Sequence, residues 1–183
     1  MKIYMTGCHA SGKTTLAKYV SNKYNLLLIK EVARVVLADK ELHIDSLRSN
    51  LEVVNDYQSS IFYRQLQEES KYKDFVSDRS LLDCLAYAGQ HSSILSTLIN
   101  SKELKDYVEE LKKPDVFLFF IRPSKSTLVQ DGVRETIFWD GVIAIDSMIK
   151  MLLEMYNIRY FQINTDNMQE RIKLVDSIIS LAQ

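Results

Sequence analysis

The sequence predicts an α/β fold in which a five-stranded parallel sheet lies between helices. Three observations carry this prediction: short apolar runs alternate with helical patterns, a Gly-rich loop joins the first run to the first helix, and the chain has the size of one domain. With 183 residues and 46% hydrophobic content, the chain can bury a sizeable core. Five Gly and two Pro leave no linker, so we expect residues 1–183 to form a single domain.

The five strands are expected where β-branched, aromatic or other apolar residues gather in short runs. Residues 115–121, Asp-Val-Phe-Leu-Phe-Phe-Ile, form the plainest buried strand and end just before Pro123. The strands are expected at residues 2–6, 26–30, 75–78, 115–121 and 158–163.

The helices are expected where apolar residues recur at helical spacing. Asp45 and Ser46 read as a fresh N-cap inside the second helical region. We expect Met148, Met151 and Met155 to pack in the core because they share helical spacing with neighbouring apolar residues. The expected helices open at Lys13 and run to residue 24, then span 31 to about 73 with interruptions, 79–89, about 92–111, 124–129, 135–156 and about 167–181.

The loop between the first strand and the first helix reads Gly-Cys-His-Ala-Ser-Gly-Lys-Thr, the full G-x-x-x-x-G-K-[ST] pattern of a phosphate-binding loop. Its glycines let backbone N–H groups converge on the oxygens of a nucleoside triphosphate. Lys13 is expected to reach the β- and γ-phosphates, and the Thr14 hydroxyl is expected to bind Mg²⁺. A fortuitous turn is the weaker reading, because strand, loop and helix agree. The predicted nucleotide contacts are Gly7, Cys8, His9, Ala10, Ser11, Gly12, Lys13, Thr14 and Thr15.

Polar side chains follow two further strands at the edge where parallel strands end and ligands bind. Asp78 is expected to hold Mg²⁺ through water or to orient an acceptor hydroxyl, and Arg79 to grip phosphate. The alternative for this segment is an ordinary helix cap. Glu31 is placed to accept the proton of an attacking hydroxyl, with Arg34 holding the acceptor. A first-turn Glu with Arg34 as its surface partner is an equal alternative.

Four segments together resemble a known family. They are the Gly-x-x-x-x-Gly-Lys-Thr-Thr loop, Glu31-Val-Ala-Arg34, Asp78-Arg79-Ser-Leu-Leu-Asp83-x-x-Ala-Tyr87 and Asp131-Gly132-Val-Arg134. The chain resembles the P-loop kinases that group ribosylnicotinamide kinases with thymidylate-kinase-like and phage nucleotide-kinase-like proteins. The resemblance implies the three-layer P-loop kinase fold with a helical lid. It also implies an acceptor-site carboxylate at Glu31, a metal or base carboxylate at Asp78, a phosphate or acceptor contact at Arg79 and a lid arginine at Arg134.

The lid is expected at about residues 122–138, where Gln130-Asp131-Gly132 reads as a hinge between helices. Arg122 and Arg134 flank this hinge, and mobile arginines suit a reaction that neutralises charge and excludes water. Surface capping is an equal reading for Arg122. By analogy with related kinases, Arg171 is expected near the adenine, and a surface ion pair is its alternative.

These observations predict an ATP- and Mg²⁺-dependent kinase of the nucleoside or nucleotide class. A kinase acting on a DNA or RNA end, or on a hydroxymethyluracil-type base, remains an alternative, although the net charge of −1 provides no global basic field. A P-loop ATPase switch is disfavoured because the chain lacks an Asn-Lys-x-Asp segment and its longest apolar strand ends Ile121-Arg122.

The same composition bears on the compartment. No apolar run reaches the length of a membrane span, which predicts a cytoplasmic protein without a membrane partner. Cys8 and Cys84 show no metal-ligand spacing and are expected to be plain thiols. The residue pattern leaves the oligomeric state and the identity of the acceptor open.

Overall fold

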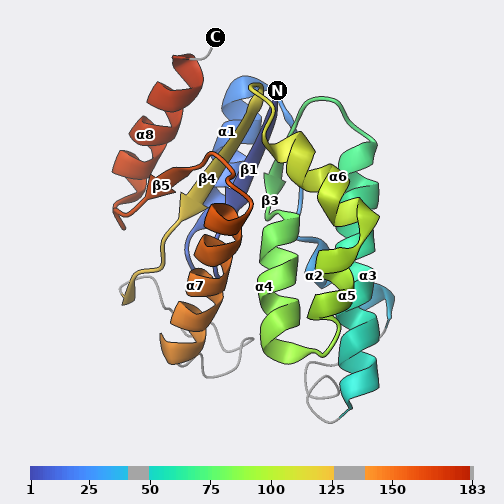
Figure 1. Ribbon diagram of the computed structural model, residues 1–183. Helices are drawn as coiled ribbons and strands as arrows, with labels where there is room; N and C mark the ends of the chain where they lie inside the picture. Colours follow the sequence, from blue (N-terminus) through green and yellow to red (C-terminus); the bar gives the residue numbers. More distant parts are fainter. Residues whose placement is uncertain (41–49, 126–138, 182–183) are drawn as a thin grey trace.

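A single parallel sheet organises the computed structural model, which describes residues 1–40, 50–125 and 139–181. The strand order is β2-β3-β1-β4-β5, and all four strand pairs are parallel. This confirms the predicted fold class (Figure 1). The strands are β1 (Lys2–Thr6), β2 (Leu27–Ile29), β3 (Phe75–Asp78), β4 (Val116–Ile121) and β5 (Phe161–Ile163).

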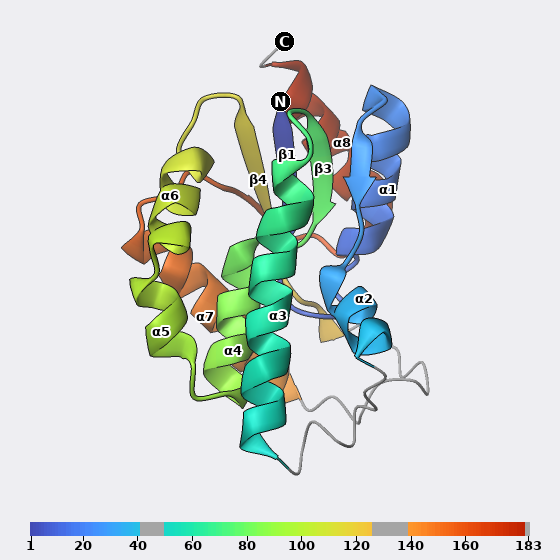
Figure 2. The ribbon, with the colours of Figure 1, turned by 90° about the vertical axis from the view of Figure 1, so that its right-hand side faces the viewer.

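Helices cover both faces of the sheet, with α1 and α8 on one side and α3 to α7 on the other (Figures 1 and 2). Alternation along β1 explains the two layers, because Ile3 and Met5 pack in the α1/α8 core while Tyr4 packs in the opposite core. The helices are α1 (Lys13–Tyr24), α2 (Val32–Asp39), α3 (Leu51–Ser70), α4 (Leu81–His91), α5 (Leu95–Asn100), α6 (Lys102–Leu111), α7 (Trp139–Met155) and α8 (Met168–Ser180).

Caps explain where two of the helices begin. The Asn50 side chain accepts hydrogen bonds from the Glu52 and Val53 amides and so starts α3. The expected cap at residues 45–46 lies outside the described residues. The single helix expected over residues 92–111 is instead two helices, because Ser101 ends α5 and caps α6 by accepting from the Leu104 amide at 3.2 Å.

Other boundaries also differ from the sequence prediction. β5 begins at Phe161, three residues later than expected. Residues 126–129 of the helix expected at 124–129 lie outside the described residues, as do residues 135–138 of the next one. No helix in the described ranges has the length and apolar character needed to cross a membrane.

The core prediction was wrong for two methionines of α7. Ile145, Ile149 and Leu152 are buried, but Met151 and Met155 are 50% and 54% exposed. Successive residues of a helix are rotated by about 100°, which turns these two methionines away from the face that packs on α4.

Candidate active site

The phosphate-binding loop connects β1 to α1 with a backbone that only glycine adopts readily at two positions. Gly7 has φ of 146°, and a Cβ there would lie 2.4 Å from the Ile121 carbonyl oxygen. Gly12 has φ of 87° and forms the N-cap of α1. Both conformations strain any L side chain, so the glycines of the motif are geometric requirements of this loop.

Lys13 lies inside the loop and is only 4% exposed. Its Nζ donates to the Cys8 carbonyl and, at 3.2 Å, to Ser11 Oγ. Burial lowers the pKa of Lys13, and the nearby Arg79 cation lowers it further. A buried cation at the N-terminus of a helix favours the binding of an anion.

Thr14 and Asp78 meet at the carboxyl edge of the sheet. Thr14 Oγ1 donates to Asp78 Oδ2 at 2.5 Å, and Asp78 is 3% exposed. The parallel register that pairs Met5 with Asp78 brings the end of β3 level with the start of the loop. Within the described ranges no cluster of three His, Cys, Asp or Glu side chains would hold a metal. Two protein oxygens beside a phosphate site instead fit Mg²⁺, which keeps water and phosphate ligands.

Glu31 and Arg79 form a two-point ion pair across the ends of β2 and β3. Glu31 Oε1 accepts from Arg79 Nε at 3.0 Å and lies 2.8 Å from Arg79 Nη2, while Oε2 accepts from Arg34 Nε at 3.0 Å. Burial by itself raises the pKa of Glu31, but the cations of Arg79, Lys13 and Arg34 outweigh it and lower the pKa to about 2. Glu31 is therefore an ionised hydrogen-bond acceptor at neutral pH.

Arg79 carries the strained backbone of the site. Its φ of 105° is rare for a side chain larger than glycine, and its amide donates to the Met5 carbonyl at 3.0 Å. The guanidinium lies over the Tyr87 ring, 5.0 Å from the centroid. The helix cap that competed with Asp78 in the sequence analysis belongs to Ser80, whose side chain forms a capping box with Asp83.

Asp83 and Tyr87 belong to the Asp-Arg-Ser segment, but no role was predicted for either residue. Asp83 is fully buried, with Oδ1 accepting from the Gly7 amide at 2.9 Å and Oδ2 accepting from Thr6 Oγ1 at 2.5 Å. The Tyr87 hydroxyl accepts from the His9 amide at 3.0 Å. The only local signal was the position of Asp83 in a capping box, since both contacts span more than seventy residues.

The other three arginines predicted to lie in the site occupy different positions. Arg122 Nε donates to Oδ1 of the buried Asp146 on α7 at 3.0 Å, and Arg122 Nη2 forms an ion pair with Asp146 Oδ2 at 2.7 Å. Arg171 is 1% exposed and donates to main-chain carbonyls, so the surface ion pair considered for it is wrong. Arg134 lies outside the described residues, with most of the predicted lid. Cys8 and Cys84 are free thiols, as expected.

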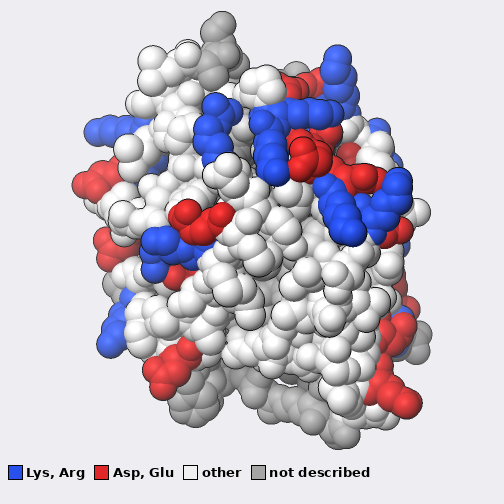
Figure 3. Space-filling model, in the orientation of Figure 1, with Lys and Arg blue, Asp and Glu red and all other residues white. Residues whose placement is uncertain are grey.

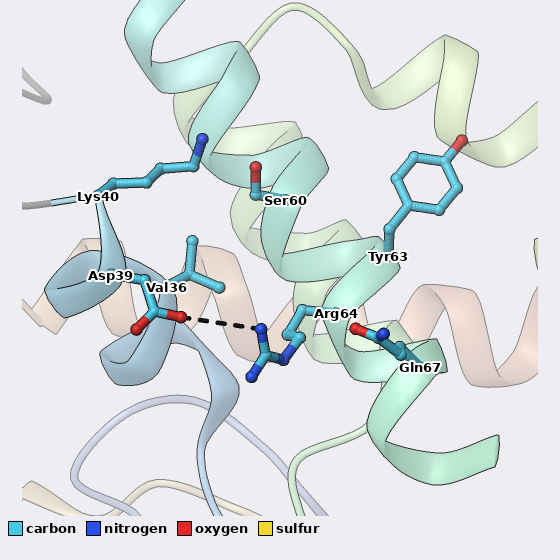
Figure 4. Close-up of a pocket in the computed structure, with 7 residues that line it drawn as sticks. All are labelled: Val36, Asp39, Lys40, Ser60, Tyr63, Arg64 and Gln67. Atoms are coloured by element: carbon cyan, nitrogen blue, oxygen red, sulfur yellow. Dashed lines mark ion pairs between the residues drawn. The ribbon is translucent and has the colours of Figure 1, made fainter. Parts of the chain in front are cut away.

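Two surface features lie apart from these groups. A pocket of about 420 Å³ lies between α2 and α3, where Asp39 and Arg64 form an ion pair (Figure 4), but it contains none of the predicted site residues. The face shown in Figure 3 mixes Lys and Arg with Asp and Glu, and its described residues form no continuous basic stripe.

Comparison with known proteins places this geometry in a family. The AAA_28 family, described as an AAA domain, matches residues 2–171. The chain belongs to this family of AAA domains. A comparison with curated protein sequences gives no match.

Solved structures share the fold at low sequence identity. Deoxyadenosine kinase from M. mycoides with bound dCTP has a TM-score of 0.74 and 16% identity, covering 98% of this chain and 99% of that one. NadR in complex with NAD and AMP-PNP has a TM-score of 0.70 and 13% identity, covering 97% of this chain and 48% of that one. Shikimate kinase from Acinetobacter baumannii has a TM-score of 0.57 and 14% identity, covering 98% and 91%. The fold is that of the P-loop kinases.

Proposed function

We propose that the protein is an ATP- and Mg²⁺-dependent kinase that transfers the γ-phosphoryl group to a hydroxyl or phosphate of a nucleoside- or nucleotide-type acceptor. One observation carries the proposal. The Thr14–Asp78 pair and the Glu31–Arg79 pair lie at neighbouring strand ends beside the phosphate loop, so a donor-side group and an acceptor-side group share one rim.

On the donor side, the loop amides and Lys13 bind the phosphates, while Thr14 and Asp78 would hold Mg²⁺. Bound there, Mg²⁺ would neutralise phosphate charge during transfer. The loop and Lys13 would hold the triphosphate in one orientation. Arg134, from the predicted lid, would add charge to the transferring phosphoryl group.

On the acceptor side, Glu31 accepts a hydrogen bond from the attacking hydroxyl. The hydroxyl oxygen forms the new P–O bond, the bond from the γ-phosphorus to the β–γ bridging oxygen breaks, and ADP leaves. A carboxylate with a pKa near 2 is a weak base. It therefore orients the hydroxyl early and receives the proton late, which suits a transition state in which the bond to the leaving group is already loose. Glu31 and Tyr87 hold Arg79 in position, and its guanidinium would contact phosphate.

Two adjacent side chains of α3, Tyr57 and Gln58, support a nucleoside-type acceptor. Tyr57 of α3 donates to the Ala33 carbonyl at 3.1 Å, and the charge of Glu31 contributes to the raised pKa of Tyr57, after burial. The next residue, Gln58, is 6% exposed, and its Oε1 accepts no hydrogen bond from the described residues. A buried carboxamide offers a donor and an acceptor together, the pattern that matches the edge of a nucleobase.

The test is a transfer assay with γ-labelled ATP and a panel of nucleosides, nucleotides, single-stranded DNA and RNA, with and without Mg²⁺. We expect Mg²⁺-dependent labelling of a nucleoside or nucleotide. Labelling of nucleic acid alone would overturn the small-molecule acceptor, and ATP hydrolysis without any labelled acceptor would instead favour the switch. Gln58→Leu serves as the acceptor-side variant, expected to raise the acceptor KM while leaving Mg-ATP binding unchanged.

A further inference from the structure

Arg171 is the largest fully buried side chain of the described residues, although it carries a guanidinium. It lies in the first turn of α8, behind the phosphate loop. Its Nε donates to the Thr165 carbonyl at 2.6 Å, and its Nη1 donates to the Ser11 carbonyl. The two carbonyls belong to segments more than 150 residues apart, so one side chain ties the loop after β5 to the phosphate loop.

The backbone of the phosphate loop at Gly12 lies close to this guanidinium. A Cβ on Gly12 would lie 2.8 Å from Arg171 Nη1 and 3.4 Å from Met168 Cε. Gly12 therefore leaves room for the guanidinium in addition to adopting its positive φ. Ser11 precedes Gly12 and Lys13 directly, so the carbonyl that Arg171 holds belongs to the turn from which the loop enters α1.

The charge of Arg171 has no carboxylate partner within ion-pair distance among the described residues. Burial lowers the pKa of Arg171, while the more distant Asp166 raises it. A guanidinium nevertheless stays protonated in proteins. Its Nη2 is buried without a hydrogen-bond partner in the described ranges. A buried guanidinium with an unpaired Nη2 costs folding free energy, so the surrounding packing must hold the side chain in this position.

We propose that Arg171 is a positioning residue for triphosphate binding, which fixes the Ser11 carbonyl on the far side of the loop so that the loop amides face the phosphates. This inference rests on the proposed function, because it assumes that the loop binds Mg-ATP. Arg171 acts by holding the loop in position and through the electrostatic field of its positive charge. It needs no contact with the nucleotide. This role differs from the adenine contact expected from the sequence.

Two variants and a matched control test the proposal. Arg171→Met removes the charge and both hydrogen bonds, whereas Arg171→Lys keeps the charge but cannot bridge two carbonyls with a planar fork. Arg159→Met is the control, because Arg159 is exposed and also donates to a main-chain carbonyl, that of Pro114, at 3.3 Å. The readouts are amide hydrogen exchange of residues 7–14 without nucleotide, the Kd for Mg-ATP and the acceptor KM.

We expect Arg171→Met to speed loop exchange and to weaken Mg-ATP binding at least tenfold, with the acceptor KM within twofold of wild type. Guanidinium ion at millimolar concentration should restore part of the lost affinity. Arg171→Lys should share the faster exchange, and Arg159→Met should match wild type in every readout. If Arg171→Met does not fold, the lysine variant decides by its loop exchange.

Unchanged exchange and affinity in both Arg171 variants would overturn the positioning role. A normal lysine variant beside a defective methionine variant would overturn the hydrogen-bonding part, because charge alone would then suffice. If wild-type protein binds no Mg-ATP, the proposed function fails, and loop exchange still decides whether Arg171 orders the loop.

Discussion

Glu31→Gln tests the charge balance of the proposed acceptor site. The substitution keeps the shape of the side chain but removes the carboxylate that pairs with Arg79 and Arg34. The folded protein lowers the pKa of Glu31 from 4.5 to about 2. At about 1.4 kcal/mol per pKa unit, the pair favours the folded state by about 3 kcal/mol at pH 7. Arg79 then keeps only the longer ion pair with Asp83, at 3.9 Å, among the described carboxylates, so Glu31→Gln should lose about that amount of unfolding free energy.

The sign of the pH dependence follows from the lowered pKa. The stabilisation is present above pH 4.5 and is lost as the pH falls through the folded value of about 2. At pH 4 the advantage of wild type over Glu31→Gln should already be smaller by about 1 kcal/mol. Urea unfolding at pH 7, 5 and 4 measures both quantities, with the exposed Glu103→Gln as control. A difference below 1 kcal/mol at pH 7, or one that does not change by pH 4, would refute this account.

The same variant and three others separate the catalytic roles. Glu31→Gln should lower transfer to the acceptor about 10²- to 10⁴-fold and spare the Mg-ATP Kd, whereas Asp78→Asn should also shift the Mg²⁺ titration; identical Mg²⁺ dependence in the two refutes this division. Lys13→Met should abolish transfer in a turnover assay yet raise the thermal unfolding midpoint, because burial lowers the pKa of Lys13 and its charge opposes folding; turnover within a few-fold of wild type would remove the phosphate-loop assignment. Arg134→Ala should lower kcat by about 10³-fold with little change in ATP affinity, and a loss confined to ATP affinity would contradict the lid mechanism.

The sequence was sufficient for features that depend on neighbouring residues. The Gly-x-x-x-x-Gly-Lys-Thr spacing predicted the turn between β1 and α1, because Gly7 and Gly12 adopt positive φ values that other residues rarely adopt. Short apolar runs predicted all five strands, and the plainest run became β4, which is buried along its whole length because both faces of a central parallel strand are covered. Helix ends were predicted less accurately. Ser101 divides a region that read as one helix, because a cap competes locally with helix continuation.

Strand order and long-range contacts were decided only by the tertiary structure. No local pattern states that β3 lies between β1 and β2, yet this order brings Asp78 to Thr14 and Arg79 to Glu31. The contacts of Asp83 and Arg171 with the phosphate loop could not be read from the sequence for the same reason. A charged residue in an amphipathic helix is predicted to lie on the surface. Its burial, and the backbone groups that it binds, depend on elements that are distant in the sequence.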